Sequence, residues 1–325
     1  MSAERKIIAF DIGGTKIAGA IVGTDGSLHR IVQEPTCQEG PEAGFEQLAA
    51  MTERFLRTGV LKKEDVLGIG IGIAAALETE TDRILWAPNI SGWRNVDLRA
   101  FLEKRFGIPV CLEYDGHAAV LGEYWQGAGK GFRSVLDVII GTGVGAGAII
   151  DGHLIRGRNR LAGAVGWQVL SLDPAADDLS SEQLGFWESL TAGPGIARYA
   201  QKVLDEADAV RIAGSRDALT AKSLFDAARS GDEAAAKVTE RIAKWIGLGI
   251  SNAVSLLNPE VIVLGGSVGH ACDFLLDTIR AEACRWAQPI SASEIQFKVS
   301  ELGTDAGIFG AAYSVILRSG VQAVQ

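Results

Sequence analysis

The segments at residues 7–22 and 135–150 are the feature that most constrains the fold of this chain. They read IIAFDIGGTKIAGAIV and VLDVIIGTGVGAGAII, and each joins two apolar runs through a turn rich in Gly or Thr. Two apolar runs around a glycine turn predict a pair of strands in a hairpin. Because the pattern occurs twice, we expect two α/β lobes that each begin with such a hairpin and face each other across a cleft.

Length and charge limit what the protein does. The chain has 325 residues, of which 47% are hydrophobic, so two lobes with buried cores are possible. The net charge of −9 argues against a general nucleic-acid binder, which would carry a basic face. No apolar run approaches the ~18 residues of a membrane span, and no signal-peptide core precedes the first predicted strand. We therefore expect a soluble cytoplasmic protein that binds neither nucleic acid nor membrane.

Further strands and helices are predicted between and after the hairpins. Apolar runs predict strands at residues 66–77, 108–114 and 260–265. Amphipathic or Ala-rich spacing predicts helices at residues 44–59, 95–107, 115–129, 232–258 and 304–317. We expect Gly59 to end the first helix, and Asn95 to cap and Gly107 to close the second. The acidic tract Ser171–Gln183 reads as a loop.

Three turns that follow predicted strands have the composition of a phosphate-binding loop. They are Asp11–Thr15, Gly141–Gly145 and Gly265–Gly269. Glycine lets backbone N–H groups converge on an anion, and threonine adds a hydroxyl donor. Any single turn reads better as an ordinary hairpin turn, and no P-loop motif occurs. The segment GTGVGAG leads into a strand rather than a helix, which disfavours a dinucleotide site. Three such turns together favour a nucleotide-phosphate site.

Asp115 stands at the junction of a predicted strand and a predicted helix, in the stretch VCLEYDGHAAVLGEYW. A carboxylate at a strand end can accept a proton from an attacking hydroxyl group in phosphoryl transfer. It can also be an acidic cap of the helix that follows. From the local residues alone, the cap is the stronger interpretation.

Six segments, in order along residues 7–317, resemble the ROK family of bacterial sugar kinases and sugar-responsive repressors. They are AFDIGGTKIAGAIV, APNISGWRNVDLRAFLEKRFGIPVCLEYD, GEYWQGAGKG, IIGTGVGAGAIIDGHLIRG, NPEVIVLGGSVG and LGTDAGIFGAAY. The resemblance implies an actin-like ATPase (ribonuclease H-like) α/β fold with two lobes and an interlobe cleft. It implies an acceptor-binding lobe at residues 1–118 and 303–325, and a nucleotide-binding lobe at residues 119–302.

The resemblance also implies ATP and Mg²⁺ as cofactors, with transfer of the γ-phosphoryl group to a sugar hydroxyl. Asp115 matches the catalytic Asp of the family, and Asp11 would hold Mg²⁺ through water. The cofactor-binding candidates are Asp11, Gly13, Gly14, Thr15, Lys16, Gly141, Thr142, Gly143, Gly145, Gly265, Gly266 and Ser267. No room precedes the first motif for the DNA-binding domain of the repressors, which favours a kinase. A homodimer is common in the family and is expected. Polyphosphate is an alternative donor, disfavoured by the negative charge.

The acceptor side departs from the family pattern. Tyr114 and His117 stand where the family has Asn, and Ala75 lies in AAA where the family has P-G-P. Ala164 and Trp167 replace a Glu and a His that bind the sugar in the family, and the His there also binds zinc. The zinc-binding cysteine cluster is absent, so no zinc is predicted. Contacts of Trp167, Phe186 and Trp187 are expected to replace the zinc site. The substrate-binding candidates are Ala75, Asn89, Gly92, Tyr114, His117, Ala164, Trp167 and Glu188.

These departures predict a changed acceptor. Each sugar hydroxyl left without a partner costs ~1–3 kcal/mol, so the losses argue against ordinary glucose. We expect a modified sugar, an amino sugar or a cyclitol. Asn89 also reads as a turn residue and Glu188 as a solvated helix charge. The alternatives are a glucokinase, fructokinase or N-acyl amino sugar kinase with a rebuilt pocket, and a non-catalytic sugar or nucleotide sensor.

Overall fold

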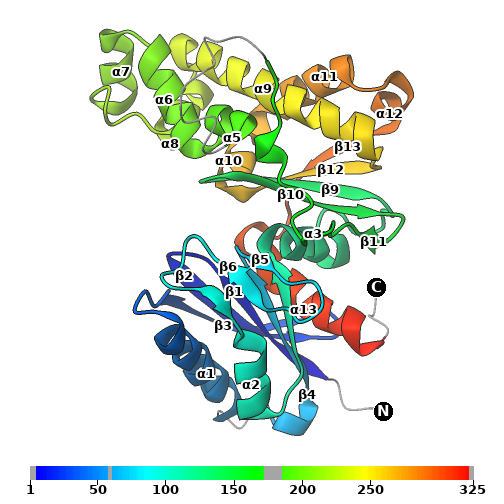
Figure 1. Ribbon diagram of the computed structural model, residues 1–325. Coiled ribbons are helices and arrows are strands. Elements are labelled where there is room, and N and C mark those ends of the chain that lie inside the picture. The colour runs from blue at the N-terminus through cyan, green and yellow to red at the C-terminus, as the bar shows by residue number, and fades with distance from the viewer. Residues whose placement is uncertain (1–4, 58–60, 172–184, 322–325) are drawn as a thin grey trace.

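Two five-stranded sheets with the same strand arrangement form the framework of the molecule (Figure 1). The computed structural model describes residues 5–57, 61–171 and 185–321. The first sheet has the order β3 (Leu28–Pro35), β2 (Lys16–Gly23), β1 (Lys6–Ile12), β4 (Val66–Ile73) and β8 (Val110–Tyr114). The second has the order β11 (His153–Leu154), β10 (Val144–Ile150), β9 (Val135–Ile140), β12 (Val261–Gly265) and β13 (Gln296–Val299).

The two predicted hairpins are confirmed as the matching halves of these sheets. In the first sheet β1 pairs antiparallel with β2 and parallel with β4. In the second, β9 pairs antiparallel with β10 and parallel with β12. The repeated segments therefore occupy equivalent places, and the turn of each hairpin lies at the same end of its sheet.

Two helices fill the space between the sheets. They are α3 (Asp115–Gln126) and α13 (Ala306–Ser319), which make the most extensive helix contact of the fold. Their apolar side chains share one core with residues of both sheets, such as Ala9 of β1 and Val263 of β12. The contact is close because it is built on glycine: a Cβ on Gly310 would overlap the carbonyl oxygen of Ala118.

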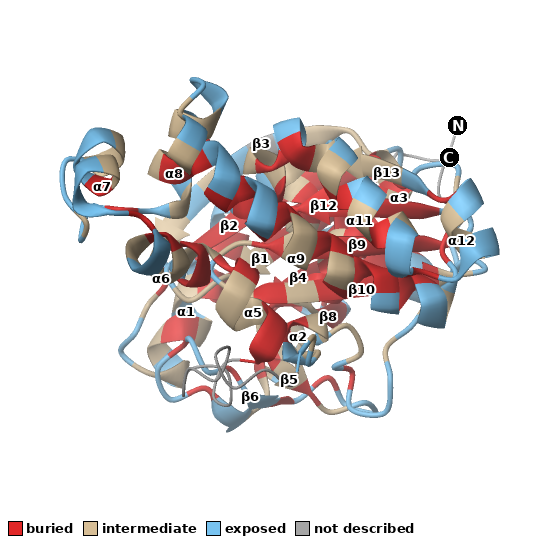
Figure 2. Ribbon diagram, turned by 90° about the horizontal axis from the view of Figure 1, so that it is seen from above, coloured by how far each residue is buried: buried red, intermediate tan, exposed pale blue. Residues whose placement is uncertain are grey.

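The remaining helices cover the outer faces of the sheets. On the first sheet they are α1 (Pro41–Arg57) and α2 (Leu98–Phe106). On the second lobe they are α5 (Phe186–Thr191), α6 (Gly193–Val203), α7 (Glu206–Ala213), α8 (Ala221–Arg229), α9 (Glu233–Leu257), α10 (Gly266–Ala271), α11 (Leu276–Trp286) and α12 (Pro289–Glu294). Figure 2 shows buried residues on the strands and exposed residues on the outer helices.

Short elements complete the fold. A small antiparallel sheet consists of β5 (Ala76–Leu77), β6 (Ile84–Trp86) and β7 (Arg94–Val96). Single 3₁₀ turns are η1 (Lys63–Asp65), η2 (Val165–Trp167), η4 (Asp273–Leu275) and η5 (Gly303–Asp305). Within the described ranges, no helix is both long and apolar enough to cross a membrane.

The local predictions have different outcomes. The prediction that Asn95 caps α2 is wrong, because Asn95 lies in β7 with a left-handed backbone. Asp97 caps α2 instead, by accepting a hydrogen bond from the Ala100 N–H. Gly107 closes α2 in the left-handed conformation, as predicted. Gly59 and most of the acidic tract at 171–183 lie outside the described residues. The proposed lobe boundary at residues 118 and 119 falls within α3 and stays a prediction.

Candidate active site

Three adjoining cavities surround the glycine turns: two are lined by residues of both lobes, and one is lined by residues of the second lobe alone. The cleft, of about 550 Å³, is lined by Asp115 and by the turn Gly141–Gly145. A second cavity of about 650 Å³ shares Gly141 and Thr142 with the cleft and extends to Ser267 and α8. A third, of about 260 Å³, shares Asp115 with the cleft and contains Asp11. The glycine turn after β9 is therefore the common wall of the first two cavities.

The first predicted turn connects β1 to β2 and places Asp11 beside the third cavity. Burial and the neighbouring Asp115 carboxylate raise the pKa of Asp11 to about 7, and Lys16 opposes this rise. Gly307 of α13 leaves the necessary space, because a Cβ there would approach the Asp11 Cγ to 2.8 Å. Gly13 and Gly14 line the cleft. Thr15 and Lys16 line none of the three cavities.

The second turn is tied to the helical part of its lobe. The Gly193 N–H donates to the Gly141 carbonyl at 2.8 Å, so the start of α6 holds the turn. The Val144 N–H donates to Glu188 Oε2 at 2.8 Å. Burial raises the pKa of Glu188, and this hydrogen bond partly offsets the rise. Glu188 therefore lines the cleft with a carboxylate whose position is fixed by the turn itself.

The third turn joins β12 to α10 rather than to another strand. Gly266 has φ +79°, and a side chain there would overlap the Ile140 carbonyl oxygen at the end of β9. Gly265 and Gly266 line the third cavity with Asp11, and Ser267 lines the second. Glycine thus lets two turns of the same lobe lie in contact.

Asp115 begins α3 directly after β8, with Tyr114 as the capping residue. Burial raises the pKa of the Asp115 carboxyl group. Hydrogen bonds from the Gly116 N–H, at 2.8 Å, and from the Tyr114 side chain favour the ionised form and limit the rise. Asp115 is the first residue inside the helix, so it does not hold the N-cap position, and the Tyr114 side chain at that position makes no capping hydrogen bond. The Asp115 side chain lines two of the three cavities.

Four of the candidate acceptor residues line the cleft together with Asp115: they are Ala75, Asn89, Tyr114 and Glu188. Gly92, His117, Ala164 and Trp167 do not line it. Trp167 is 58% exposed, so it does not pack in place of the family's zinc site. Phe186 and Trp187 are buried, and the Trp187 indole N–H donates to the Trp245 carbonyl at 3.0 Å.

His117 points away from the cleft. Its ring is fully buried, its Nε2 lies 2.9 Å from the Ala162 carbonyl oxygen, and its Nδ1 has no hydrogen-bond partner. Burial lowers the pKa of the imidazole, which favours the neutral ring. The neutral ring donates through Nε2 to Ala162, so His117 joins α3 to the loop before η2.

The sequence interpretation missed two groups of residues near the site. Asp137 of β9 lines the third cavity, is buried, and leaves its Oδ1 without a partner. Burial, and then the nearby Glu123, raise the pKa of the Asp137 carboxyl group well above its usual range. The second group is Arg160 with its acidic partners Asp82 and Glu113. A charged residue inside an apolar strand run was a readable signal for Asp137 and Glu113, whereas Arg160 and Asp82 lie in loops.

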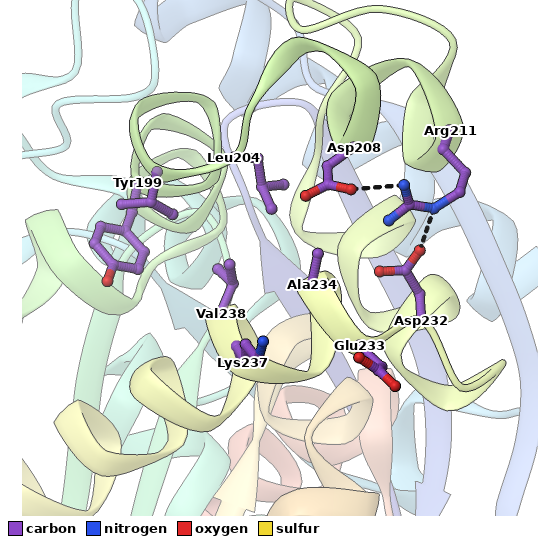
Figure 3. Close-up of a pocket in the computed structure, with 10 residues that line it drawn as sticks. Tyr199, Leu204, Asp208, Arg211, Asp232, Glu233, Ala234, Lys237 and Val238 are labelled. Carbon is purple, nitrogen blue, oxygen red and sulfur yellow. Dashed lines mark hydrogen bonds and ion pairs between the residues drawn. The ribbon is translucent and has the colours of Figure 1, made fainter.

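A further hollow of about 730 Å³ lies on the outer helices α6, α7 and α9, away from these turns (Figure 3). Arg211 projects into it and is already paired with Asp208 at 2.6 Å and Asp232 at 2.7 Å. Tyr199 and Val238 supply apolar surface. None of the predicted site residues lines this hollow, so its size does not mark it as the active site.

The third cavity fits a hydrated metal ion. Asp11, Asp115 and Asp137 all line it, and carboxylate oxygen is the ligand that Mg²⁺ prefers. Over the ranges that the structure describes, no three Asp, Glu, His or Cys side chains are grouped closely enough to hold a bare ion. Mg²⁺ commonly keeps several of its waters, so contact through water suits this arrangement.

Comparison with known proteins agrees with this geometry. The sequence model of the ROK family matches residues 7–317. A glucokinase of Halalkalibacterium halodurans is 34% identical, with 96% of each chain covered. A glucokinase of Thermotoga maritima is 30% identical, covering 97% of this chain and 98% of the relative. The structure of a ROK family glucokinase from Streptomyces griseus in complex with glucose and AMPPNP superposes with a TM-score of 0.77, at 32% identity, over 95% of this chain and 98% of that one.

The paired sheets and the glycine turns between them define an actin-like ATPase fold. Within that class, the chain belongs to the ROK family. The match spans both sheets and every predicted turn, so it covers the complete site.

Proposed function

We propose that this protein is an ATP-dependent carbohydrate kinase that transfers the γ-phosphoryl group to a hydroxyl of a sugar or sugar-like polyol. The observation that carries the proposal is the shared wall of the two larger cavities. Asp115 and Glu188 line the cleft, while Gly141 and Thr142 line both the cleft and the neighbouring cavity. A nucleotide in that cavity and an acceptor in the cleft would meet at the turn, whose N–H groups suit phosphate.

Asp115 is the proposed general base. The attacking hydroxyl oxygen forms a bond to the γ-phosphorus while the bond from that phosphorus to the β-phosphate oxygen breaks. The hydroxyl proton passes to the Asp115 carboxylate, and ADP leaves. A well-placed base of this kind contributes roughly 10²–10⁴-fold to a rate. Bound Mg²⁺, held through water by Asp11, would neutralise charge on the phosphates.

The acceptor pocket supports a substrate other than unmodified glucose, although the named relatives are glucokinases. Asn89 and Glu188 remain as hydrogen-bonding side chains of the cleft. Tyr114 occupies space between the lobes, since its hydroxyl would lie 3.7 Å from a Cβ on Gly145. Ala75 offers no hydrogen bond from its side chain. A pocket with these few polar groups leaves several hydroxyls of a hexose unpaired, at ~1–3 kcal/mol each.

An ADP-release assay tests the proposal. The panel would contain glucose, fructose, N-acetylglucosamine, N-acetylmannosamine and a cyclitol, with ATP or polyphosphate as donor. We expect turnover of at least one acceptor with ATP, and a loss of about 10²–10⁴-fold in kcat for Asp115→Asn. Asp277→Asn, the same change at an exposed site in the first turn of α11, is the matched control.

Two outcomes would oppose the proposal. If no acceptor is turned over above the Asp115→Asn background, the protein is not a kinase of this class. Binding of a sugar and a nucleotide without turnover, seen as a rise in melting temperature, would favour the sensor instead.

A further inference from the structure

The cleft has an apolar side that the reaction does not use. Trp86 of β6 and Leu161 both line it, and they are 55% and 41% exposed. Figure 1 labels β5 and β6 at the part of the lower lobe that faces the upper lobe. Large apolar side chains that stay exposed inside a cavity, rather than singly on the outer surface, are typical of ligand sites.

Trp86 and Leu161 come from distant segments that are held together by buried ion pairs. Arg160, next to Leu161, is 2% exposed and pairs with Asp82 and with Glu113. Asp82 precedes β6 in the same hairpin that carries Trp86. Removing the partners of a buried arginine strongly destabilises the folded protein. The ion pairs of Arg160 therefore hold the segment that contains Leu161 in place.

Two more hydrogen bonds fix the same loop. The Thr79 hydroxyl group donates to the Arg158 carbonyl at 3.1 Å, and Arg160 Nη2 donates to the Leu112 carbonyl at 2.7 Å. Arg158 and Arg160 therefore anchor the residues around Leu161 to the hairpin β5–β6 and to β8. The apolar side of the cleft is a preformed surface, so a ligand would not have to order it on binding.

The chemistry of this surface suggests what it contacts. An unsubstituted sugar presents hydroxyl groups around its edge and only a small C–H face, which one aromatic ring suffices to cover. Here a tryptophan and a leucine are available in addition to Pro88 and Ala76. Burying apolar surface of the ligand against them is favourable by ~25 cal/mol per Å². The adenine base has another candidate site, because Phe225 and Val268 line the cavity on the far side of the glycine turn.

We propose that Trp86 and Leu161 form a subsite for an apolar substituent of the acceptor, so that the preferred acceptor is a sugar carrying an alkyl, aryl or acyl group. The proposal rests on the proposed kinase function for the identity of the cleft as the acceptor site. Arg160 is then a positioning residue of the subsite, acting through Leu161, and Asp115 remains at the hydroxyl that is phosphorylated.

A matched pair of ligands tests the subsite by binding and by turnover. Phenyl and methyl β-D-glucopyranoside share the same sugar and differ only in the apolar group. Isothermal titration with the wild-type protein in the presence of Mg·ADP should show the phenyl glucoside binding at least tenfold more tightly. Glucose and N-acetylglucosamine form a second pair, for which the same preference for the substituted sugar is expected. Where turnover occurs, kcat/KM should show the same ratios.

Trp86→Ala and Leu161→Ala should each reduce the phenyl-to-methyl preference to threefold or less. Leu85→Ala is the control, because Leu85 is also on β6, is 36% exposed, and does not line the cleft. The control should keep the wild-type preference. Circular dichroism would show that all three variants are folded.

The subsite is excluded if the folded wild-type protein binds the phenyl glucoside no better than the methyl glucoside. It is also excluded if Leu85→Ala lowers the preference as much as Trp86→Ala. These measurements distinguish a failure of the kinase proposal from a failure of the subsite proposal. A phenyl preference in binding without turnover of any acceptor contradicts the kinase and leaves the subsite intact. Turnover of several sugars without such a preference contradicts the subsite alone.

Discussion

At the scale of single residues, the pKa values near the cleft connect structure to activity. A base must be ionised to accept a proton, and burial raises the pKa of Asp115. Asp11 has a pKa of about 7, raised by burial and by Asp115 itself. Because the two carboxyl groups interact, the apparent pKa values of a pH profile belong to the pair rather than to one residue.

We predict that kcat/KM falls as the pH decreases, with a midpoint above the ordinary carboxylic acid value of about 4. The sign follows from the raised pKa, since protonation of Asp115 removes the base. Tyr114→Phe deletes a hydrogen bond that favours ionised Asp115, so the midpoint should move to higher pH. The measurement is the pH dependence of kcat/KM with Mg²⁺ in excess.

Tyr124→Phe, in the same helix α3, is the control for this prediction because Tyr124 lines none of the three site cavities. A midpoint that stays unchanged in Tyr114→Phe, or that moves equally in Tyr124→Phe, would contradict the role given to the Tyr114 hydroxyl group.

At the scale of elements, the pair α3 and α13 determines where Asp115 lies. Asp115 is the first residue of α3, and α3 packs on α13 through Gly122 and Gly310. A Cβ on either glycine would overlap a carbonyl oxygen of the facing helix, at Ala306 or Ala118. The helices therefore approach as closely as their backbones allow, and a change in this spacing would move Asp115.

We predict that Gly310→Ala destabilises the protein by at least about 1–3 kcal/mol, the range for overpacking a close contact. Urea unfolding measures this change. Leu317→Ala, at a half-exposed position of the same helix, should alter stability by only about 0.5 kcal/mol. A Gly310→Ala variant as stable as the wild type would show that the two helices separate without cost.

At the scale of the whole molecule, the proposed ligands occupy cavities that meet at one glycine turn. Because both lobes line the cleft, a nucleotide and an acceptor bound together would contact both lobes at once. Each ligand present at 100 times its dissociation constant stabilises the folded protein by about 2.7 kcal/mol.

We predict that Mg·AMPPNP and the best acceptor of the panel together raise the melting temperature by more than the sum of their separate effects. The reason is that each ligand would order the turn Gly141–Gly145 for the other. Differential scanning fluorimetry measures the shifts. Merely additive shifts would mean that the two sites do not communicate through the turn.

Much of this protein is determined by patterns that short stretches of sequence contain. The two hairpins, the glycine turns and the helix closed by Gly107 were predicted because backbone preferences depend on near neighbours. Asp11 and Asp115 were identifiable as site candidates because each follows an apolar strand run, and the ROK motifs around them are collinear. Asn95 failed as a cap because Asp97, two residues later, offers the same chemistry in a better position.

Other features depend on segments that are distant in the sequence and meet only in the folded protein. His117 is a candidate substrate-binding residue in the sequence, yet in the folded protein its ring contacts the Ala162 carbonyl instead. Arg160 lies in an ordinary loop sequence, yet it finds buried partners in Asp82 and Glu113. Trp86 and Leu161 share a cavity, and that arginine is one of the residues that join their segments. Side-chain direction and long-range contact are set by the packing of the whole chain, which no local pattern records.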